Sequence, residues 1–588
     1  MSPYLQPAGG DPAEPRPQAS MQISVDGQPV QALPGQTVAA ALMAAGRDSW
    51  RTTRGAEAKP RGVFCGIGAC FDCLVVVNGV PDVRACQRTI APGDSISTQH
   101  GAVLPAAVNG STAAAPRSQW SVVVVGAGPA GMNAALAAAD AGVDVLLVDA
   151  GRAVGGQYHR QLPAEFNARR PGRVHHGWTS FARVRDRIAR HERIEYLAET
   201  SVWAIEPLTG RTGRRLWLQT GAADAPGRRM SSVEAEALVL APGAYDRVLP
   251  FPGWDLPGVY SAGAAQALAK GQRIAIGQRV LVGGTGPFLL PVAESLLGVG
   301  AEVAGLLEAN HLSTIAQGWR TDPLVARSKL REAAGYAGLL ARHRLRLQHG
   351  RAVIAAHGTD RVEAVTVARL TPDWRPIPGT ERQVEVDAVC IGYGFTAQLE
   401  LAVSARCELG TGPDGGPAVV VDDSQRTSDP AVWAAGELTG IGGADLAAAE
   451  GRVAGQAAAH AVRTDSSVPP TTARRKVVEG KRFAAALARA YPVRDGWRSW
   501  SDDGTLVCRC EGVTRGALES ALAERDVAGS RPLKLTSRAG LGLCQGRVCA
   551  RTVADLAAAH QPGVRAEHHR PIAVPVRLAD LANLQEDL

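Results

Sequence analysis

Residues 121–151 read "SVVVVGAGPAGMNAALAAADAGVDVLLVDAG". The stretch begins as an apolar strand, turns at Gly126, Gly128 and Gly131, continues as an alanine-rich helix and ends in a second strand. The first glycine allows the tight turn, the second lets the backbone approach a pyrophosphate, and the third lets helix and strand pack closely. The N–H groups at the start of the helix favour an anion. This stretch predicts a dinucleotide-binding fold of the Rossmann type.

Two features after the glycine turn indicate which dinucleotide binds. Asp149 follows the second strand, where it can reach ribose hydroxyl groups. Gly156 and Gln157 belong to a Gly-Gly-Gln sequence that resembles a flavoprotein more than a dehydrogenase. We therefore expect FAD. The contacts expected from this part of the chain are Gly126, Gly128, Pro129, Ala130, Gly131, Asp149, Ala150, Gly156 and Gln157.

Two later segments resemble FAD-binding segments of two-dinucleotide flavoproteins. Residues 237–254, "ALVLAPGAYDRVLPFPGW", resemble the strand by which the chain returns past the flavin. Residues 429–455, "DPAVWAAGELTGIGGADLAAAEGRVAG", resemble the late FAD motif, in which an acid meets the ribityl and phosphate region. That acid is usually Asp, and here it is Glu437. The further FAD contacts expected are Val202, Ala241, Gly243, Gly436 and Glu437.

A second strand–turn–helix–strand unit is predicted at residues 279–309, "RVLVGGTGPFLLPVAESLLGVGAEVAGLLEA". Its turn has Gly284 and Gly286, but Leu289 stands where the third glycine would be. A leucine there should push the helix from the strand or alter the phosphate pocket. Glu308 ends the second strand and would repel a 2′-phosphate, which argues against NADPH. Two alternatives remain: an NADH site, and a Rossmann-shaped scaffold with a weak or empty site.

A cysteine tetrad lies in the N-terminal part, around "RGVFCGIGACFDC" at residues 61–73. Its members are Cys65, Cys70, Cys73 and Cys86. The spacing C-x4-C-x2-C-x12-C matches the plant-type 2Fe-2S signature at its first three positions. Gly66, Gly68 and Ala69 let the backbone pass close to a cluster and donate N–H groups to it. A 2Fe-2S cluster is favoured, with zinc and structural thiols as the alternatives.

A second tetrad lies near the C-terminus. Its members are Cys508, Cys510, Cys544 and Cys549. The sequences "CRCE" and "CQGRVC" resemble the bacterioferritin-associated-ferredoxin-like (BFD-like) 2Fe-2S domain, and zinc is the alternative. Thr514 can cap one helix and Cys549 starts another, so helix N-termini would stabilise thiolates. The remaining cysteines, Cys390 and Cys407, are expected to be buried apolar residues.

Composition and charge exclude some functions. Apolar residues make up 45% of the chain, and Lys plus Arg minus Asp plus Glu is 63 − 56 = +7. No basic run or aromatic ladder accompanies this charge, which argues against nucleic-acid binding. No stretch has the composition of a transmembrane helix, and the first 20 residues lack the features of a secretory signal. We therefore expect a cytoplasmic protein without structural disulfides.

Hairpin and helix signals define the N-terminal module. Asp26-Gly27 and Asn78-Gly79 are turn signals between strands, and Thr37 can cap an alanine-rich helix. Two hairpins and one helix indicate a small domain of the β-grasp kind. The predicted fold class is α/β: a two-dinucleotide-binding flavoprotein core with an N-terminal β-grasp ferredoxin-like domain and a small helical BFD-like domain at the C-terminus.

The predicted boundaries follow two Pro-containing polar linkers. They are a disordered tail (1–20), a 2Fe-2S domain (21–100), a linker (101–119), the two-dinucleotide domain (120–462), a second linker (463–475), and a BFD-like domain with a tail (476–588). The second nucleotide subdomain is expected at about residues 255–385. The core has no C-x-x-C or C-x4-C pair, which disfavours thiol–disulfide reductase chemistry. His159, His175 and His176 are only weak candidates for a base, so no catalytic residue is predicted.

With these three modules in this order, the chain resembles the electron-transfer subunits of bacterial heteromeric amino acid and imino acid dehydrogenases. Members include hydrogen cyanide synthase, opine oxidases, D-hydroxyproline dehydrogenase and the first half of the sarcosine oxidase α subunit. The resemblance is carried by "RGVFCGIGACFDC" (61–73), "PFPGWDLPGV" (250–259) and "AGLGLCQGRVC" (539–549), and it covers roughly residues 21 to 575. A folate-binding C-terminal domain like that of sarcosine oxidase α is not expected, which argues against tetrahydrofolate chemistry.

The resemblance implies a division of labour. A separate FAD subunit of the D-amino acid oxidase type would oxidise a C–N bond, and this chain would pass the electrons to an acceptor of the respiratory chain. FAD and two 2Fe-2S clusters are implied, with FMN at a subunit interface and NAD or ATP at the second nucleotide fold left open. A hetero-oligomer is expected, cytoplasmic or peripheral at the inner face of the membrane. The alternatives are a self-contained NADH-dependent reductase and a non-enzymatic cluster-based sensor or scaffold.

Overall fold

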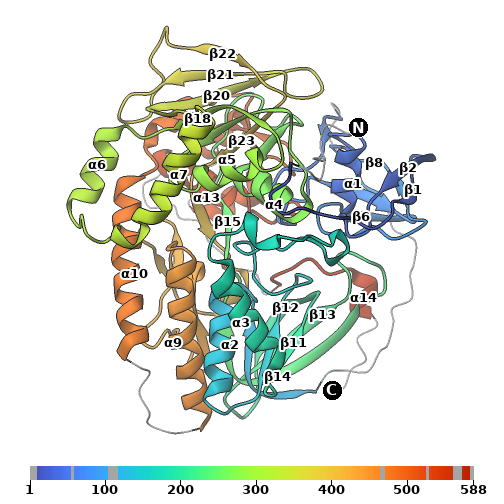
Figure 1. Ribbon diagram of the computed structural model, residues 1–588, viewed down its shortest axis with the longest axis vertical. Helices are drawn as coiled ribbons and strands as arrows, with labels where there is room; N and C mark the ends of the chain where they lie inside the picture. Colours follow the sequence, from blue (N-terminus) through green and yellow to red (C-terminus); the bar gives the residue numbers. More distant parts are fainter. Residues whose placement is uncertain are drawn as a thin grey trace.

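The computed structural model describes residues 10–53, 58–103, 117–463, 471–524, 529–560 and 572–582. The N-terminal module lies beside a larger centre that contains one mixed and one parallel sheet (Figure 1). The predicted α/β class is confirmed. The linker segments 104–116 and 464–470, and residues 1–9 of the predicted tail, lie outside the described residues.

The N-terminal module contains a five-stranded sheet of order β2-β1-β7-β5-β6. Its strands are β1 (Met21–Val25), β2 (Gln28–Ala32), β5 (Leu74–Val77), β6 (Val80–Arg84) and β7 (Ser95–Ser97). Three short strands pair beside it: β3 (Arg51–Thr52), β4 (Pro60–Arg61) and β8 (Gln99–His100). Both predicted hairpins form, β1–β2 and β5–β6. Helix α1 (Val38–Ala44) begins as predicted, with the Thr37 hydroxyl accepting the N–H of Ala40 at 3.2 Å.

The first nucleotide fold is built on a seven-stranded sheet in which β11-β10-β9-β14-β27 are parallel neighbours. These strands are β9 (Gln119–Val125), β10 (Val145–Val148), β11 (Ile194–Leu197), β14 (Arg229–Leu240) and β27 (Val432–Ala434). Strand β13 (Arg214–Thr220) pairs antiparallel with β14, and β12 (Thr200–Pro207) pairs antiparallel with β13.

Helices α2 (Pro129–Asp140) and α9 (Ala444–Arg463) pack against each other on this sheet, with α3 (Trp178–Arg190) beside α2. The helices approach closely because α9 presents glycines to α2. A Cβ at Gly451 would lie 2.0 Å from the carbonyl oxygen of Ala130, and one at Gly455 would lie 2.1 Å from that of Ala134. Only glycine fits at these two positions.

The second nucleotide fold has a parallel sheet of order β16-β23-β17-β18-β19. Its elements are β16 (Val259–Ser261), β17 (Arg279–Gly284), β18 (Glu302–Glu308), β19 (Leu347–His349), β23 (Ala388–Gly392), α4 (Ala262–Gln272) and α5 (Leu289–Leu297). The antiparallel strands β20 (Arg351–His357), β21 (Ala364–Arg369) and β22 (Arg382–Glu385) lie at the top of Figure 1. The last strand of this sheet ends at Gly392, slightly beyond the expected subdomain of residues 255–385.

Within the second fold, the helices α6 (Leu312–Arg320) and α7 (Leu330–Arg342) follow β18 and precede β19. Shorter elements lie in the connections between the two folds: β15 (Ala244–Asp246) paired with β24 (Phe395–Ala397), β25 (Leu409–Thr411) paired with β26 (Pro417–Val419), and α8 (Glu400–Ser404). The 3-10 turns are Ala164–Phe166, Pro171–Val174, Arg327–Lys329, Glu437–Thr439 and Asp495–Ser499.

The second predicted linker, 463–475, is shorter in the structure. Helix α10 (Thr471–Ala490) already begins at Thr471, directly after Pro469 and Pro470 in the sequence, and packs against α9 and α6. It therefore belongs with the centre. The C-terminal module follows it with β28 (Leu506–Cys508), β29 (Val513–Thr514), α11 (Arg515–Glu524), α12 (Ser530–Ser537), α13 (Ala550–His560) and α14 (Leu578–Ala582). Thr514 caps α11 as predicted, because its hydroxyl accepts the N–H of Ala517 at 3.2 Å.

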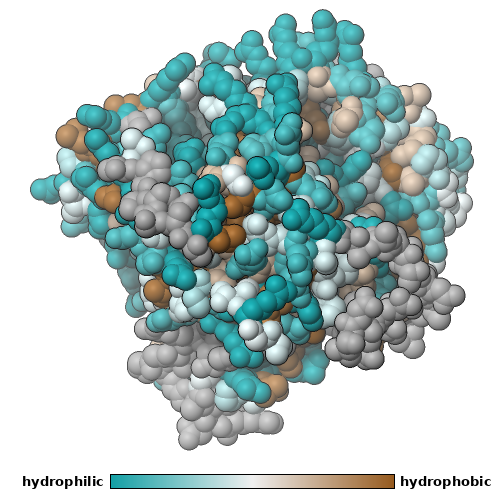
Figure 2. All heavy atoms as spheres, turned by 90° about the horizontal axis from the view of Figure 1, so that it is seen from below, coloured by the Kyte–Doolittle hydropathy of each residue, from teal (hydrophilic) through white to brown (hydrophobic). Residues whose placement is uncertain are grey.

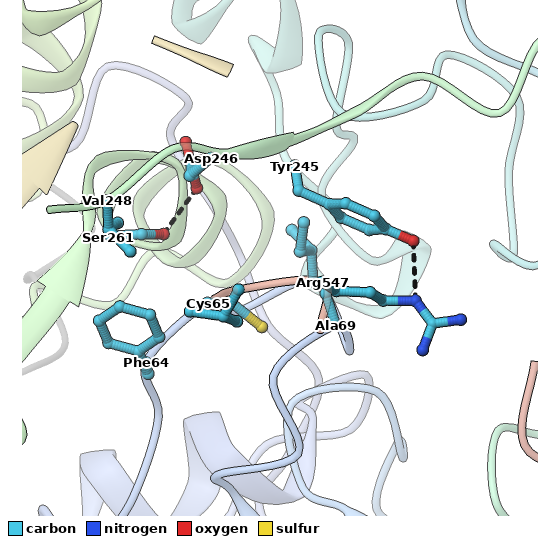
Figure 3. Close-up of a pocket in the computed structure, with 10 residues that line it drawn as sticks. Phe64, Cys65, Ala69, Tyr245, Asp246, Val248, Ser261 and Arg547 are labelled. Atoms are coloured by element: carbon cyan, nitrogen blue, oxygen red, sulfur yellow. Dashed lines mark hydrogen bonds between the residues drawn. The ribbon is translucent and has the colours of Figure 1, made fainter. Parts of the chain in front are cut away.

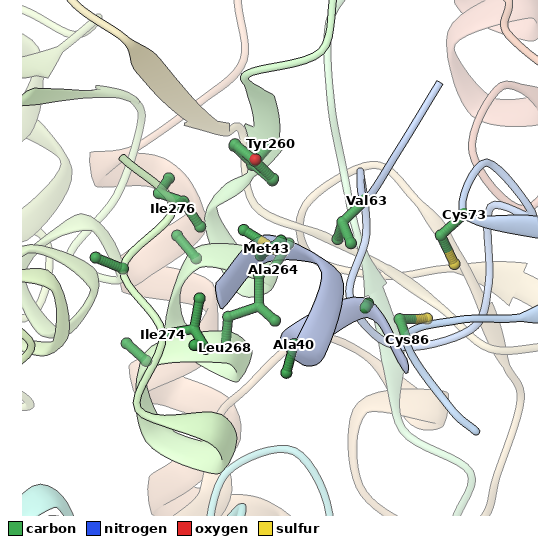
Figure 4. Packing of buried hydrophobic residues seen from close by; sticks show 14 of the residues in the cluster. Ala40, Met43, Val63, Cys73, Cys86, Tyr260, Ala264, Leu268, Ile274 and Ile276 are labelled. Atoms are coloured by element: carbon green, nitrogen blue, oxygen red, sulfur yellow. The ribbon is translucent and has the colours of Figure 1, made fainter. Parts of the chain in front are cut away.

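One apolar core runs from the N-terminal module into the second nucleotide fold. Ala40 and Met43 of α1 belong to the same buried cluster as Ala264 and Leu268 of α4 (Figure 4). The N-terminal module is therefore packed directly onto the centre. Cys390 and Cys407 are buried at 0% and 7% exposure, which confirms the prediction that they are apolar core residues.

The described part of the predicted disordered tail is packed against the centre, which corrects that prediction for residues 10–20. Asp11 and Arg273 are buried at 0% and 1% side-chain exposure and form an ion pair of 2.7 Å. The backbone N–H of Arg16 also donates to the carbonyl oxygen of Phe166. A polar, Pro-rich composition indicated disorder, but a buried partner 262 residues away holds the segment.

The lower face of the molecule is mainly hydrophilic, with small, separate hydrophobic areas (Figure 2). Among the described residues, no helix is long and apolar enough to cross a bilayer.

Candidate functional site

The glycine turn after β9 forms a cradle at the start of α2. A Cβ at Gly131 would lie 1.6 Å from the carbonyl oxygen of Gly126, and a Cβ at Gly126 would lie 2.2 Å from that of Ala241. A Cβ at Gly128, by contrast, would meet only the Cα of Gly156, at 4.0 Å. The turn is therefore closed by backbone on two sides and open at Gly128. Pro129 starts the helix, and no side chain caps it.

Most of the predicted FAD residues converge on this turn. A Cβ at Gly156 would lie 2.8 Å from the Cα of Gly128, and a Cβ at Gly436 would lie 3.0 Å from the Cβ of Ala130. Ala241 meets Gly126, as described above. The uncapped N–H groups and the open space fit a pyrophosphate, which is an anion that needs close backbone approach.

Two acids border the cradle. The Asp149 carboxylate accepts the N–H of Ala127 and that of Gly151, both at 2.6 Å, and burial raises its pKa. Glu437 accepts the N–H of Gly443 at 2.7 Å, and burial raises its pKa to about 7. Both acids therefore lie where the sequence places them, one after β10 and one after β27.

Four predicted residues lie less centrally. Ala150 and Gln157 are exposed, and Gln157 bonds to Arg160. Val202 is buried in β12, in the apolar cluster on the sheet face opposite α2. Gly243 has φ +90° and accepts the N–H of Gln398 at 3.0 Å, which ties it to the connection between the two folds.

The first cysteine tetrad is gathered in a buried loop. Cys65, Cys70, Cys73 and Cys86 are 6%, 3%, 1% and 5% exposed. The N–H groups of Cys70 and Asp72 point at the sulfurs of Cys65 and Cys70, at 3.4 and 3.5 Å. Hydrogen bonds from Cys73 and Gln87, with the charge of Arg84, lower the pKa of Cys86 to about 7. N–H donors aimed at sulfur and a nearby cation fit thiolate ligands.

The second tetrad is also gathered. The sulfur of Cys510 lies 3.8 Å from that of Cys508 and 3.5 Å from that of Cys544. A Cβ at Gly542 would lie 2.6 Å from the Cys510 sulfur, so glycine is required where this backbone passes the thiol. Cys549 directly precedes α13 and its carbonyl accepts the N–H of Val553, as predicted.

Among the described residues, no three or more His, Cys, Asp or Glu side chains are arranged to hold a metal ion. The fit of each tetrad to an iron–sulfur cluster therefore rests on its donor set. Four converging thiols with backbone N–H groups or glycines around them suit a two-iron cluster, whose four thiolates are shared between two irons.

A pocket lies where the three modules meet (Figure 3). It is small and is lined by Phe64, Cys65, Ile67, Ala69, Tyr245, Asp246, Val248, Ser261, Arg547 and Val548. The Ser261 hydroxyl donates to Asp246 at 2.6 Å, and Arg547 donates to the Tyr245 oxygen at 3.0 Å. Burial raises the pKa of Asp246 to about 6.

The first cysteine loop rests on the start of α4 at this pocket. The N–H of Ser261 donates to the carbonyl oxygen of Phe64 at 3.0 Å. A Cβ at Gly66 would lie 3.2 Å from the Cα of Ala264. The loop that carries Cys65 is thereby held by backbone contacts next to β15, the strand that follows the first nucleotide fold.

The second nucleotide turn differs from the first. The Glu308 carboxylate is 1% exposed and accepts the Thr285 hydroxyl and the N–H groups of Gly286 and Asn310, at 2.6–2.8 Å. Asn310 also donates to the carbonyl oxygen of Pro492 at 3.1 Å. Leu289 begins α5 and is 1% exposed. The acid expected to repel a 2′-phosphate is therefore buried against its own turn.

The three histidines lie in the segment after Gly156. His159 stacks on Phe181 with ring centroids 4.4 Å apart, and burial lowers its pKa to about 4. His175 is similarly buried, with a pKa lowered to about 3. His176 bonds to Glu294 at 2.9 Å, which raises its pKa. Nothing in this arrangement identifies one of them as a base.

Several residues at the site were not anticipated from the sequence. Glu450 of α9 is 1% exposed and accepts the N–H of Gly436 and the Thr439 hydroxyl, both at 2.9 Å. Asp246, Ser261 and Arg547 line the pocket at the module junction. Arg547 stands inside "CQGRVC", so its position between two cysteines was the available signal.

Comparison with known proteins agrees with this geometry. Residues 120–461 match the family described as pyridine nucleotide-disulphide oxidoreductase, and residues 18–101 match the 2Fe-2S iron-sulfur cluster binding domain. The fold and the cradle thus define a flavoprotein oxidoreductase with FAD and a 2Fe-2S domain. The chain belongs to the pyridine nucleotide-disulphide oxidoreductase family.

Its relatives are subunits of larger oxidoreductases, which confirms the resemblance to that subunit family. Hydrogen cyanide synthase subunit HcnB of Pseudomonas aeruginosa is 31% identical over 73% of this chain and 90% of the relative. An opine oxidase subunit of Rhizobium meliloti is 31% identical over 81% of this chain and 89% of the relative. The solved L-proline dehydrogenase of P. horikoshii shares the fold, with a TM-score of 0.71 and 19% identity over 99% of this chain and all of the other.

Proposed function

We propose that the chain is the electron-transfer subunit of a heteromeric dehydrogenase that oxidises the C–N bond of an amino acid, imino acid or opine. A separate flavoprotein subunit of the D-amino acid oxidase type takes the substrate. This chain receives the electrons and delivers them to an acceptor of the respiratory type. The relatives whose names designate them as subunits of hydrogen cyanide synthase and opine oxidase support this division.

The observation that carries the proposal is the meeting of both cysteine loops beside the flavin-binding fold. Cys65 and Arg547 line one pocket with Tyr245 and Asp246 of β15. Phe71 of the first cysteine loop packs against Cys544 of the second. A substrate oxidase needs one reaction centre, whereas a chain that passes electrons on needs several redox sites placed close together.

Each module then has a defined part. The start of α2 and the cradle around Gly128 bind the pyrophosphate of FAD, with Asp149 and Glu437 at its sugar and ribityl regions. Cys65, Cys70, Cys73 and Cys86 hold the first 2Fe-2S cluster, and Cys508, Cys510, Cys544 and Cys549 hold a second in a BFD-like domain. When bound, a flavin exchanges two electrons and a 2Fe-2S cluster exchanges one, so such a set links hydride chemistry to single-electron transfer.

The alternative, a self-contained NADH-dependent reductase, needs a working second nucleotide turn. Glu308 is buried against that turn, and Asn310 beside it is tied to Pro492. A nucleotide ribose would have to displace these bonds before it reached the acid. The geometry therefore favours the relay over the reductase, and an occupied NAD or ATP site is not part of the proposal.

The test begins with anaerobic purification of the full chain and quantification of iron, sulfide and flavin. NADH is then added while the absorbance spectrum is recorded, and the protein is finally assayed with its co-expressed flavoprotein partner and an artificial acceptor. We expect about four irons and one FAD per chain, no bleaching by NADH, and amino acid oxidation only with the partner present.

Two results would count against this function. Rapid flavin bleaching by NADH would move the assignment to the reductase. Efficient amino acid oxidation by the isolated chain would remove the division of labour. An FMN at the subunit interface would be detected as flavin in excess of one per chain in the reconstituted complex only.

A further inference from the structure

A buried ion pair joins the two cysteine loops. Asp72 stands between Cys70 and Cys73, and Arg509 stands between Cys508 and Cys510. The Nε of Arg509 donates to Oδ2 of Asp72 at 2.7 Å, and the side chains are 6% and 1% exposed. The two residues are 437 positions apart in the sequence, so this contact exists only because the first and last modules are docked.

Arg509 also binds the centre of the molecule. Its Nη1 donates to the carbonyl oxygen of Trp254 at 2.5 Å. Its guanidinium lies 4.1 Å from the ring centroid of Phe64 and 4.9 Å from that of Trp254. Trp254 in turn donates its ring N–H to the carbonyl oxygen of Leu506 at 2.7 Å. One guanidinium therefore contacts all three modules at a single point.

A planar, always charged guanidinium suits this place better than an ammonium group. It donates along its edge to a carboxylate and a carbonyl while its faces contact aromatic rings. Removal of one partner leaves the other charge buried without compensation, which is far more costly than loss of an exposed pair. The ion pair between Arg361 and Asp48 joins the centre to the N-terminal module, and its side chains are 58% and 16% exposed. It offers a more exposed ion pair for comparison with the buried pair of Arg509 and Asp72.

We propose that Arg509 is the positioning residue that holds the N-terminal cysteine loop against the C-terminal cysteine loop, so that the N-terminal module stays bound even without its covalent linker. The proposal rests on the proposed function only in giving the cysteine loops a redox role. The contact itself is a docking interface within the chain, with Asp72 as the group that Arg509 recognises.

The experiment uses the full chain with a recognition sequence for a site-specific protease inserted within residues 104–116. The folded protein, purified anaerobically, is cut and passed over a size-exclusion column at decreasing concentrations. We expect the two parts of the otherwise unaltered protein to co-elute. After the same cut, Arg509→Gln and Asp72→Asn should each raise the dissociation constant at least about 100-fold. Arg361→Gln should change it less than about fivefold.

A double-mutant cycle assigns the effect to the pair. Asp72→Asn combined with Arg509→Gln should cost much less than the two single changes together, because the contact is then already lost. If uncut Arg509→Gln fails to fold, judged by its circular dichroism and flavin content, Arg509→Lys decides, since it keeps the charge and loses the fork and the ring contacts. It should still weaken association at least about tenfold.

Separation of the cut parent protein, or co-elution of cut Arg509→Lys and Asp72→Asn at parental concentrations, would overturn the proposal. The elution depends on neither substrate nor NADH. A failed relay assignment would therefore leave this result unchanged. The NADH and partner assays use the uncut protein, so separation of the cut parts does not affect them.

Discussion

The Oε1 atom of Glu308 accepts the hydroxyl of Thr285 at 2.6 Å. The carboxylate at the end of β18 thus binds the turn that follows β17, within a core where it is 1% exposed. In the first fold, Asp149 also bonds to its turn, but it stays partly exposed. The two acids occupy equivalent places in two similar units, and only one of them remains accessible to a ligand.

The buried position of Glu308 makes stability depend on pH. Burial raises its pKa from 4.5 to about 7, so between these values the folded protein holds a proton that the unfolded chain has released. Stability should therefore fall as the pH rises, by up to about 1.4 kcal/mol per pH unit from this group. Glu308→Gln lacks this titration, so its melting temperature relative to the parent should increase from pH 5 to pH 8. Parallel melting curves for the two proteins over this range would contradict the assignment.

Substitutions at Gly128 and Gly131 should distinguish an effect on cofactor binding from an effect on folding. Gly128→Ala adds a methyl group to open space at φ −75°, so the fold should keep its stability to within about 1 kcal/mol while the flavin content falls. Gly131→Ala places a Cβ 1.6 Å from a backbone oxygen and should lower both. The absorbance ratio of flavin to protein and the melting temperature of the flavin-free protein are the measurements. Normal flavin content in Gly128→Ala would contradict the assignment of the pyrophosphate to this cradle.

Serine substitutions in the tetrads should each remove one cluster. Cys70→Ser and Cys544→Ser are expected to lower bound iron by about two atoms per chain, because each tetrad serves a separate two-iron cluster. Cys390→Ser, at a buried cysteine outside both tetrads, is the control and should leave iron unchanged. Metal analysis and electron paramagnetic resonance together show which of the two clusters each variant has lost. Zinc instead of iron in the C-terminal tetrad would refute its cluster assignment.

The N-terminal segment of residues 10–20 should stabilise the folded protein mainly through Asp11. Asp11→Ala leaves the buried Arg273 without its carboxylate, and the free energy of unfolding should fall by about 3–5 kcal/mol. Glu14→Ala removes an exposed pair with Arg170 and should cost less than about 1 kcal/mol. Chemical denaturation of both variants measures the difference. Equal effects would mean that the segment contributes through its backbone alone.

Local patterns allowed prediction of the parts of the molecule that depend on neighbours in sequence. The turn from Gly126 to Gly131, the Thr37 and Thr514 caps and the Asp26-Gly27 hairpin each involve a few consecutive residues with specific backbone requirements. The family was predicted from a resemblance carried by residues 61–73, 250–259 and 539–549, and the first iron–sulfur domain from the spacing of its four cysteines. The comparisons confirm both. The assignment of Val202 to FAD, by contrast, rests on resemblance alone, and its side chain lies in the core.

Contacts between distant segments could not be predicted in this way. Arg509 between two cysteines gave no sign of its partner, because a carboxylate 437 residues away is chosen by the docking of whole modules. The Pro-rich composition around Asp11 likewise indicated disorder, because its buried partner Arg273 is distant in sequence. The second linker was predicted to extend to residue 475, whereas α10 begins at Thr471, because the polar first turn of this helix lacks the apolar spacing of a buried helix.

The chain carries one ferredoxin-like module for each flavin-binding fold, and the shared core of α1 and α4 keeps that module in contact with the fold. A separately encoded ferredoxin would reach its partner by diffusion, and the fraction of occupied partners would fall on dilution. Here Ala40 and Met43 are already seated against Ala264 and Leu268. The ratio of ferredoxin-like module to flavin-binding fold is one to one in every molecule, at any expression level. A separate ferredoxin could not bind at the same surface of α4, because α1 already covers it.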